Sequence, residues 1–368
     1  MKIAVLSSHT PSLFWFRTDM MSAFQTLGHE VIAIGNEPES EWAEKFREKN
    51  IRYVHADVKR NGMNPLGELK TLRSLKAVLR REMPDKLFTY QAKTVIYGGV
   101  AARQLGIREV YPLIAGLGSV FLGDSPVMKA ARLVLKAEYR IALGMAKRVF
   151  FQNPDDADFF VRHRLVSREK IVMIHGSGVN LEKFQRQPLP EKTAFLCISR
   201  LIRDKGVGEY LQAAELVRER HPDVRFLLVG PYDTNPSAIH PEELQRYLDN
   251  GSVEYYGETT DVRPYLAQCS VFVLPSYREG TPKTVLEAMA SGRAVITTDV
   301  PGCRETVRDG VNGYLVPEKD AEALAEKMAA LIAHPETVRE MAAAGRKMAE
   351  DVFDVRKVNE TICRTMKL

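Results

Sequence analysis

Short apolar runs alternate with amphipathic stretches along the first half of the chain. Apolar runs bounded by polar or turn residues are typical of buried strands, and they lie at residues 2–7, 30–35, 51–56 and 86–89. Helical spacing of apolar positions fills the intervals between and after them, at residues 12–27, 41–49, 66–82 and 94–105. This alternation predicts a parallel sheet with helices on both of its faces.

A second series of the same kind begins at Thr193. Its strands are expected at residues 194–199, 225–230, 253–257, 271–274 and 294–298. Residues 185–191, which contain Pro and Gln, are expected to link the two series, and residues 354–368 to form a helix that packs back on the first domain. The pattern therefore predicts an α/β protein with one domain at 1–184, joined by the helix 354–368, and a second domain at 191–352.

Composition supports two soluble domains and excludes several classes of protein. The chain has 368 residues, of which 45% are hydrophobic and 27% charged, and no apolar run reaches the roughly 18 residues of a membrane helix. The four scattered cysteines fit no metal or redox spacing and are expected to be reduced, in the cytosol. The turn at residues 7–14 has no glycine, which argues against an NAD dehydrogenase.

The charge of the chain is unevenly distributed. Between Lys59 and Arg148 there are 17 Lys and Arg against 6 Asp and Glu, a net of +11, whereas the rest carries 35 against 41, a net of −6. Such a basic region suits anionic lipid or nucleic acid. Two basic amphipathic helices, at 66–82 and 126–147, favour an anionic membrane surface over nucleic acid, unless their apolar sides only cover the sheet.

The segment from Pro275 to Gly292 predicts a strand, a polar loop and a helix in succession. Residues 271–274 form the buried strand, and Pro275 ends it. Thr281 is expected as the N-cap and Pro282 as the first helical residue, where a missing N–H costs nothing. In an α/β sheet the carboxyl end of a strand is where ligands bind.

Two glutamates flank the predicted helix start. Glu279 lies in the loop and Glu287 about one and a half turns inside the helix. The N–H groups of Lys283 and Thr284 are placed to stabilise an anion, and Gly280 permits close approach of a ligand. The arrangement suits a sugar–diphosphate–ribose ligand; the alternative is an ordinary helix cap with solvated acids.

Four stretches in chain order resemble motifs of glycosyltransferase family four, whose members have the GT-B fold of two Rossmann-like domains facing a cleft. The stretches are Glu279-x7-Glu287, Ser199-Arg-Leu-Ile-Arg-Asp-Lys-Gly206, Ser177-Gly-Val-Asn180 (with Asn where the family has Asp) and Asp309-Gly-Val-Asn-Gly-Tyr-Leu315. The resemblance covers nearly the whole chain. Within the family, Leu228–Ser237, Thr89–Gly98 and Gly116–Ser119 are similar to PglA-type transferases, which act on undecaprenyl-diphosphate-linked sugars.

The resemblance implies roles on the donor side. Arg200 and Lys205 would hold the diphosphate of a UDP-sugar and stabilise the charge that grows on the leaving phosphate. Glu279 would contact the donor sugar and Glu287 the ribose. Further nucleotide-sugar contacts would come from Gly280, Thr281, Lys283 and Thr284. The family retains anomeric configuration, and no metal or other cofactor is expected because the two cations serve instead.

The acceptor side is less determined. Many relatives place a histidine where this chain has Gln91-Ala92-Lys93, so that role is not carried over. Lys93 with Gly118 and Ser119 is a candidate for the acceptor diphosphate, and His9 and Arg17 lie at the same edge by topology. For His9 a solvated or packed histidine, and for Lys93 an ordinary helix-start lysine, stay open as alternatives.

The expected activity is therefore a retaining, metal-independent glycosyltransferase on the cytosolic face of the membrane. It would move an N-acetylhexosamine, GalNAc or GlcNAc, from a UDP-sugar to a polyprenyl-diphosphate-linked saccharide in bacterial glycan assembly. Two alternatives stay open: a GT-B nucleotide-sugar epimerase on a soluble substrate, and a non-catalytic membrane-bound partner of an assembly complex.

Overall fold

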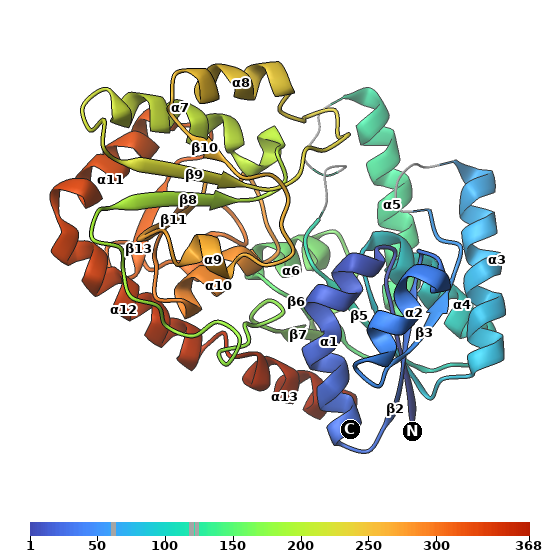
Figure 1. Ribbon diagram of the computed structural model, residues 1–368. Coiled ribbons are helices and arrows are strands. Elements are labelled where there is room, and N and C mark those ends of the chain that lie inside the picture. The colour runs from blue at the N-terminus through green and yellow to red at the C-terminus, as the bar shows by residue number, and fades with distance from the viewer. Residues whose placement is uncertain (60–63, 118–120, 122–124) are drawn as a thin grey trace. The chain divides into compact units, whose positions relative to one another are not determined.

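The protein packs as two compact units, each built on one parallel sheet (Figure 1). The computed structural model describes the chain apart from residues 60–63, 118–120 and 122–124. The first unit contains residues 1–177 and 358–368, and the second contains residues 178–357. Phe184, which the sequence assigns to the first domain, lies in a core of the second unit.

The first unit has a seven-stranded sheet with the order β3-β2-β1-β4-β5-β6-β7. Its elements are β1 (Lys2–Leu6), α1 (Thr10–Thr26), β2 (Glu30–Gly35), α2 (Glu39–Arg47), β3 (Arg52–His55), α3 (Pro65–Glu82), β4 (Lys86–Tyr90), η1 (Thr94–Gly98), α4 (Gly99–Gln104), β5 (Glu109–Ile114), α5 (Pro126–Gly144), β6 (Val149–Phe151), α6 (Pro154–Arg162), η3 (Arg168–Lys170) and β7 (Ile171–Met173).

Alternate side chains of the strands bury the two faces of the first sheet. Ile3 and Val5 face a core shared with α1 and α2, whereas Ala4 and Leu6 face a core shared with α3 and α4. This is the period-2 alternation of a strand covered on both sides. The prediction of helices on both faces is therefore confirmed for this sheet.

Helix α13 (Val355–Met366) returns to the first unit, as the sequence predicts. Its residues Val358, Ile362 and Met366 lie in the same core as α1. The buried ammonium of Lys86 donates a hydrogen bond of 2.6 Å to the carbonyl of Met366, which ties the helix end to β4.

The second unit has a six-stranded sheet with the order β10-β9-β8-β11-β12-β13. Its elements are β8 (Ala194–Ile198), η4 (Arg203–Lys205), α7 (Val207–Arg218), β9 (Arg225–Val229), α8 (Pro241–Asp249), β10 (Glu254–Tyr255), α9 (Arg263–Leu266), β11 (Val271–Leu274), α10 (Lys283–Ala290), β12 (Ala294–Thr298), η5 (Arg304–Thr306), β13 (Gly313–Val316), α11 (Ala321–Ala333) and α12 (Pro335–Asp351).

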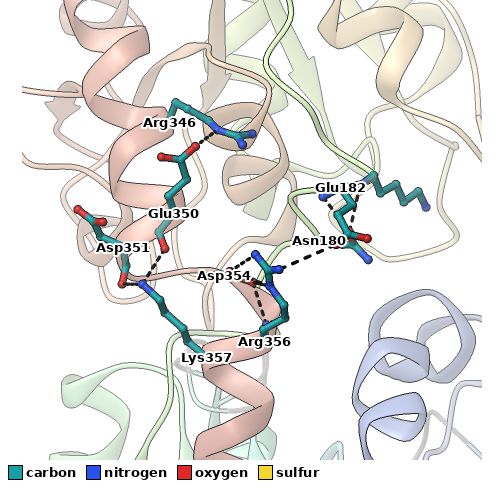
Figure 2. A network of polar contacts seen from close by, with 9 residues as sticks. Asn180, Glu182, Arg346, Glu350, Asp351, Asp354, Arg356 and Lys357 are labelled. Carbon is teal, nitrogen blue, oxygen red and sulfur yellow. Dashed lines mark hydrogen bonds and ion pairs between the residues drawn. The ribbon is translucent and has the colours of Figure 1, made fainter. Parts of the chain in front are cut away.

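A network of polar contacts joins the segment around Asn180 to the end of α12 and the start of α13 (Figure 2). The backbone of Val179 pairs with that of residues 353–355, and Asn180 accepts hydrogen bonds from the two backbone N–H groups of residues 182 and 183. Arg346 of α12 donates to the carbonyls of Phe184 and Ala290. Because Ala290 ends α10, this arginine satisfies an otherwise open carbonyl at the end of that helix.

Candidate active site

Four loops of the second unit meet at the carboxyl edge of its sheet. Strands β9, β8, β11 and β12 are neighbours and run parallel, so the segments that follow them emerge side by side. These segments hold nearly all the predicted donor-side residues, and Glu287 follows them in α10. Tertiary contact, rather than sequence proximity, brings the loops after β8 and β11 together.

Lys205 and Glu279 form an ion pair that joins two of these loops. The Lys205 ammonium, on η4 after β8, contacts Oε1 of Glu279 in the loop after β11. The hydroxyl of Ser276 donates to the same oxygen at 2.9 Å, and both side chains of the pair are largely enclosed. The sequence predicts both residues at the site, and the structure adds that each is held by the other.

Arg200 is held by an acid that sequence reasoning missed. Its Nη1 donates to Oδ2 of Asp233 at 2.7 Å, and Asp233 lies in the loop after β9. The other oxygen of Asp233 accepts the backbone N–H of Asn235 at 2.8 Å, which fixes the carboxylate. A usable signal was present, because Asp233 follows a predicted strand whose carboxyl end lies at the ligand-binding edge.

Helix α10 begins one residue later than predicted. Pro282 is its N-cap and Lys283 its first residue, so the prediction that Thr281 caps the helix is wrong. The N-cap Pro282 makes no side-chain cap hydrogen bond, and the N–H groups of Lys283 and Thr284 lie in the first turn. A proline cap offers no side-chain oxygen, which leaves this turn suited to an external anion. Gly280 is buried in the preceding loop.

Glu287 is a buried carboxyl inside α10. It is only 8% exposed, and burial raises its pKa from 4.5 to about 7, opposed in part by the positive charges of Lys283 and Lys183. Burial disfavours the ionised form because the charge loses its hydration. A carboxyl of this kind gains from a ligand whose hydroxyl groups donate to it.

Three glycines allow the loops to touch through their backbones. A Cβ added to Gly206 would lie 2.0 Å from the carbonyl oxygen of Pro275, and one added to Gly302 would lie 2.2 Å from that of Glu279. The same addition at Gly230 would lie 1.7 Å from the oxygen of Ser199. All three have positive φ, so glycine is required for conformation and for space. These loops are therefore in close backbone contact with one another.

At the carboxyl edge of the first sheet, Gln91 organises a polar cluster. Its φ is 74°, and its Oε1 accepts hydrogen bonds from Ser7 Oγ (3.0 Å), Ser8 N (3.0 Å) and Ser8 Oγ (2.8 Å). His9 is the N-cap of α1 without a side-chain cap bond, and its backbone N–H donates to Ser7 Oγ at 3.1 Å. Sequence reasoning placed no role on Gln91, whose positive φ gives no signal in the sequence.

The two cations predicted on the acceptor side have different surroundings. Lys93 forms an ion pair with Glu68 of α3 at 2.5 Å. Arg17 of α1 is 4% exposed and lies over the ring of Tyr90, with 4.9 Å from Cζ to the ring centroid. Burial lowers the pKa of Arg17. Gly118 and Ser119 lie outside the described residues.

Each of the two basic helices buries some apolar residues and exposes others. In α3, Leu75 and Leu79 are buried against the sheet, whereas Leu66 and Leu69 in the first turns are exposed. In α5, Leu133 is 71% exposed and Ile141 is 60% exposed. The exposed leucine and isoleucine stand among Lys and Arg residues, which leaves an apolar and basic surface on α5.

The described part of the chain has neither a clustered metal-ligand set nor a helix that could cross a membrane. Across residues 1–368 without the three gaps, no group of three or more His, Cys, Asp or Glu side chains is placed to hold a metal ion. Within the same residues, every helix is too short or too polar to cross a membrane.

Comparison with known proteins agrees with the two-unit architecture. Residues 16–176 match a family described as glycosyl transferase 4-like domain, and residues 192–334 match glycosyl transferases group 1. Among solved structures, sucrose-phosphate synthase from Thermosynechococcus elongatus has a TM-score of 0.82 at 22% identity, covering 100% of this chain and 98% of that one. HepE from Anabaena with UDP and glucose has a TM-score of 0.79 at 17% identity, covering 100% and 99%. These likenesses establish the GT-B fold.

Curated proteins are also similar to this chain in sequence. N,N'-diacetylbacillosaminyl-diphospho-undecaprenol alpha-1,3-N-acetylgalactosaminyltransferase of Campylobacter jejuni is 30% identical over 90% of this chain and 89% of its own length. UDP-Gal:alpha-D-GlcNAc-diphosphoundecaprenol alpha-1,3-galactosyltransferase of Escherichia coli is 28% identical over 70% of this chain and 68% of its own length. The chain therefore belongs to the glycosyltransferases of family four, with a glycosyl transferase 4-like domain followed by a group 1 domain.

Proposed function

We propose that this protein is a retaining, metal-independent transferase that moves an N-acetylhexosamine, GalNAc or GlcNAc, from a UDP-sugar to a polyprenyl-diphosphate-linked saccharide. The single observation that carries the donor side is the Lys205–Glu279 ion pair, which joins the loop after β8 to the loop that leads into α10. The two curated relatives named above act, by their names, on diphospho-undecaprenol acceptors. The product would belong to a bacterial surface glycan or glycoprotein glycan.

Each donor-side residue has a task in this proposal. Lys205 and Arg200 bind the diphosphate and stabilise the charge that develops on it as the glycosidic bond breaks, so no metal is needed. The N–H groups at the start of α10 add further donors. Glu279, held by Lys205 and Ser276, contacts hydroxyl groups of the donor sugar. Glu287 accepts the ribose hydroxyls.

The proposal requires the cations to exchange partners when the donor binds. Lys205 is paired with Glu279 and Arg200 with Asp233 in the protein alone. A diphosphate brings two further negative charges into this group, and Arg200 binds it as a fork while Lys205 acts as a point charge. The acids then keep the site near neutrality before the donor arrives.

In this proposal the first unit binds the acceptor and the membrane that carries it. The exposed apolar residues Leu133, Val134 and Ile141 of α5, among Lys129, Lys136 and Arg140, provide an apolar and basic surface for an anionic bilayer. His9 follows β1 and Lys93 follows β4, so both lie near the carboxyl edge of the first sheet, where the proposal places the acceptor. The protein is then peripheral on the cytoplasmic face.

A donor screen tests the proposal. The purified protein is offered UDP-GlcNAc, UDP-GalNAc, UDP-Gal, UDP-Glc and GDP-mannose without metal, first by thermal shift and then with a lipid-diphosphate-linked monosaccharide. A donor at a hundredfold excess over its Kd raises stability by about 2.7 kcal/mol. Selective stabilisation by one UDP-N-acetylhexosamine, and transfer that resists EDTA with retained anomeric configuration, are expected. Absence of a shift with every donor contradicts the proposal.

A further inference from the structure

Arg17 is a buried cation whose charge meets no carboxylate in the described structure. Its side chain is 96% enclosed within the first unit, and its Nε is buried without a hydrogen-bond acceptor. The guanidinium lies over the ring of Tyr90, and burial raises the pKa of Tyr90, so the phenol stays neutral. Enclosing a charge without a partner costs several kcal/mol.

Two other enclosed cations of the first unit are paired. Lys93 contacts Glu68, and Lys86 contacts Glu109 as well as the carbonyl of Met366. Arg293, which is fully buried in the second unit, meets no carboxylate but donates Nη1 to the carbonyl of Pro188 at 3.0 Å, while its Nε and Nη2 have no hydrogen-bond partner among the described residues. Arg17 differs because no described residue accepts a hydrogen bond from its guanidinium. Because a buried guanidinium without an acceptor destabilises the protein, its presence indicates a ligand that accepts hydrogen bonds from it.

The surroundings of Arg17 supply further donors. The hydroxyl of Tyr90, over whose ring Arg17 lies, is 3.1 Å from that of Ser12. Next to Tyr90, the side-chain oxygen of Gln91 accepts the backbone N–H of Ser8. A backbone N–H can only donate, so this contact identifies Oε1, and the NH2 of Gln91 is the end left for a ligand. The cluster holds one cation and several donors but no acid.

We propose that Arg17, together with the side-chain NH2 of Gln91, forms an anion site that binds phosphate groups. The anion is the diphosphate of the lipid-linked acceptor; this assignment rests on the proposed function, whereas phosphate binding does not. Lys93, whose charge Glu68 already neutralises, is then a supporting residue for the loop and not the diphosphate ligand.

Inorganic pyrophosphate and phosphate probe the site directly. Thermal unfolding is followed at saturating UDP, which fills the donor site, with and without each anion. Pyrophosphate is expected to stabilise the wild type, and Arg17→Met is expected to raise its apparent Kd at least about tenfold, the worth of a charged hydrogen bond. Without anion, Arg17→Met should unfold at the same temperature as the wild type or higher, because a buried charge is removed. A wild type that ignores pyrophosphate, or an unchanged Kd in Arg17→Met, overturns the site.

Two further variants separate binding from folding. Gln91→Glu keeps the oxygen that accepts from Ser7 and Ser8 but replaces the NH2 with a negative oxygen, so it should weaken pyrophosphate binding at an unchanged fold. Arg293→Met, the matched buried arginine of the second unit, should keep wild-type pyrophosphate affinity. Equal weakening in Arg17→Met and Arg293→Met would reduce Arg17 to a packing residue.

A turnover arm distinguishes the source of the anion. For a polyprenyl-diphosphate-linked acceptor, Arg17→Met should raise KM about tenfold or more and leave the Kd of the UDP-sugar unchanged. A change confined to free pyrophosphate would overturn the assignment to the lipid acceptor. If no acceptor turns over in the wild type, the proposed function fails while the pyrophosphate result still decides the site.

Discussion

The cations of the two units are held in opposite ways. In the second unit, Lys205 and Arg200 are each paired with a carboxylate before any ligand binds. In the first unit, Arg17 is enclosed and no described acid meets it. A paired cation stabilises the site while no ligand is bound. The ion pair must break when the ligand binds, and this lowers the net binding energy. An unpaired buried cation destabilises the empty protein but loses no partner when an anion arrives.

The largest expected effect comes from removing the cation of the donor-side pair. Lys205→Met should lower kcat about 10²- to 10³-fold, because a preorganised charge beside the leaving phosphate is lost. Steady-state kinetics with the donor found in the screen measure the change. Arg203→Met is the matched control, since Arg203 lies on the same turn but is exposed and pairs with Glu243. Similar losses in both variants would show that the turn, and not the Lys205 charge, matters.

The backbone contact between loops of the second unit can be broken at a single glycine. Gly206→Ala should lower the free energy of unfolding by about 3 kcal/mol, since it adds a clash with Pro275 to the strain of a left-handed residue. Gly310→Ala has nearly the same φ, 73° against 69°, but its Cβ meets nothing within 4 Å, so about 1 kcal/mol is expected. Denaturant unfolding compares them, and equal losses would contradict the proposed contact.

The buried carboxyl of α10 predicts a pH dependence with a definite sign. Its pKa of about 7 lies above the ordinary 4.5, so between these values the folded protein holds more protons than the unfolded chain. The free energy of unfolding therefore falls as pH rises from 4.5 to 7, by at most about 3 kcal/mol. UDP affinity should instead fall below pH 7, where Glu287 gains a proton and loses an acceptor. Glu287→Gln should remove both dependences; calorimetry at pH 5.5 and 8 tests this.

The smallest expected effects concern the surface of α5. Lys129→Gln should weaken binding to anionic vesicles about fivefold, the worth of one basic residue near a charged bilayer. Leu133→Gln should weaken it by a similar factor through lost apolar burial. Vesicle sedimentation measures both. Leu216→Gln is the control, because Leu216 is an exposed leucine of the second unit. Equal binding by all three variants would argue against α5 as the membrane surface.

The donor-side residues stay a prediction, and that prediction rests on local signals. A strand, a loop and a helix follow one another within residues 271–290, and the spacing of Glu279 and Glu287 is a property of that one segment. Thr281 was predicted as the N-cap because threonine is favoured at that position and proline at the next one, the first helical residue. In the structure Pro282 is itself the N-cap. The sequence of α3 shows several leucines at helical spacing. Which of them are buried, Leu75 and Leu79, depends on how the helix packs against the sheet.

The sequence by itself determined the α/β order and the motifs that indicate the family, because hydrophobic period and turn chemistry act over a few residues. Tertiary structure decided which charges meet. Lys205 and Glu279 are 74 residues apart, and their pairing needs the neighbouring order of β8 and β11. Tertiary structure also decided that Gly206 touches Pro275 and that Arg17 is enclosed over Tyr90. Burial and ion pairing depend on what packs around a side chain, and that surrounding is assembled from segments far apart in the chain.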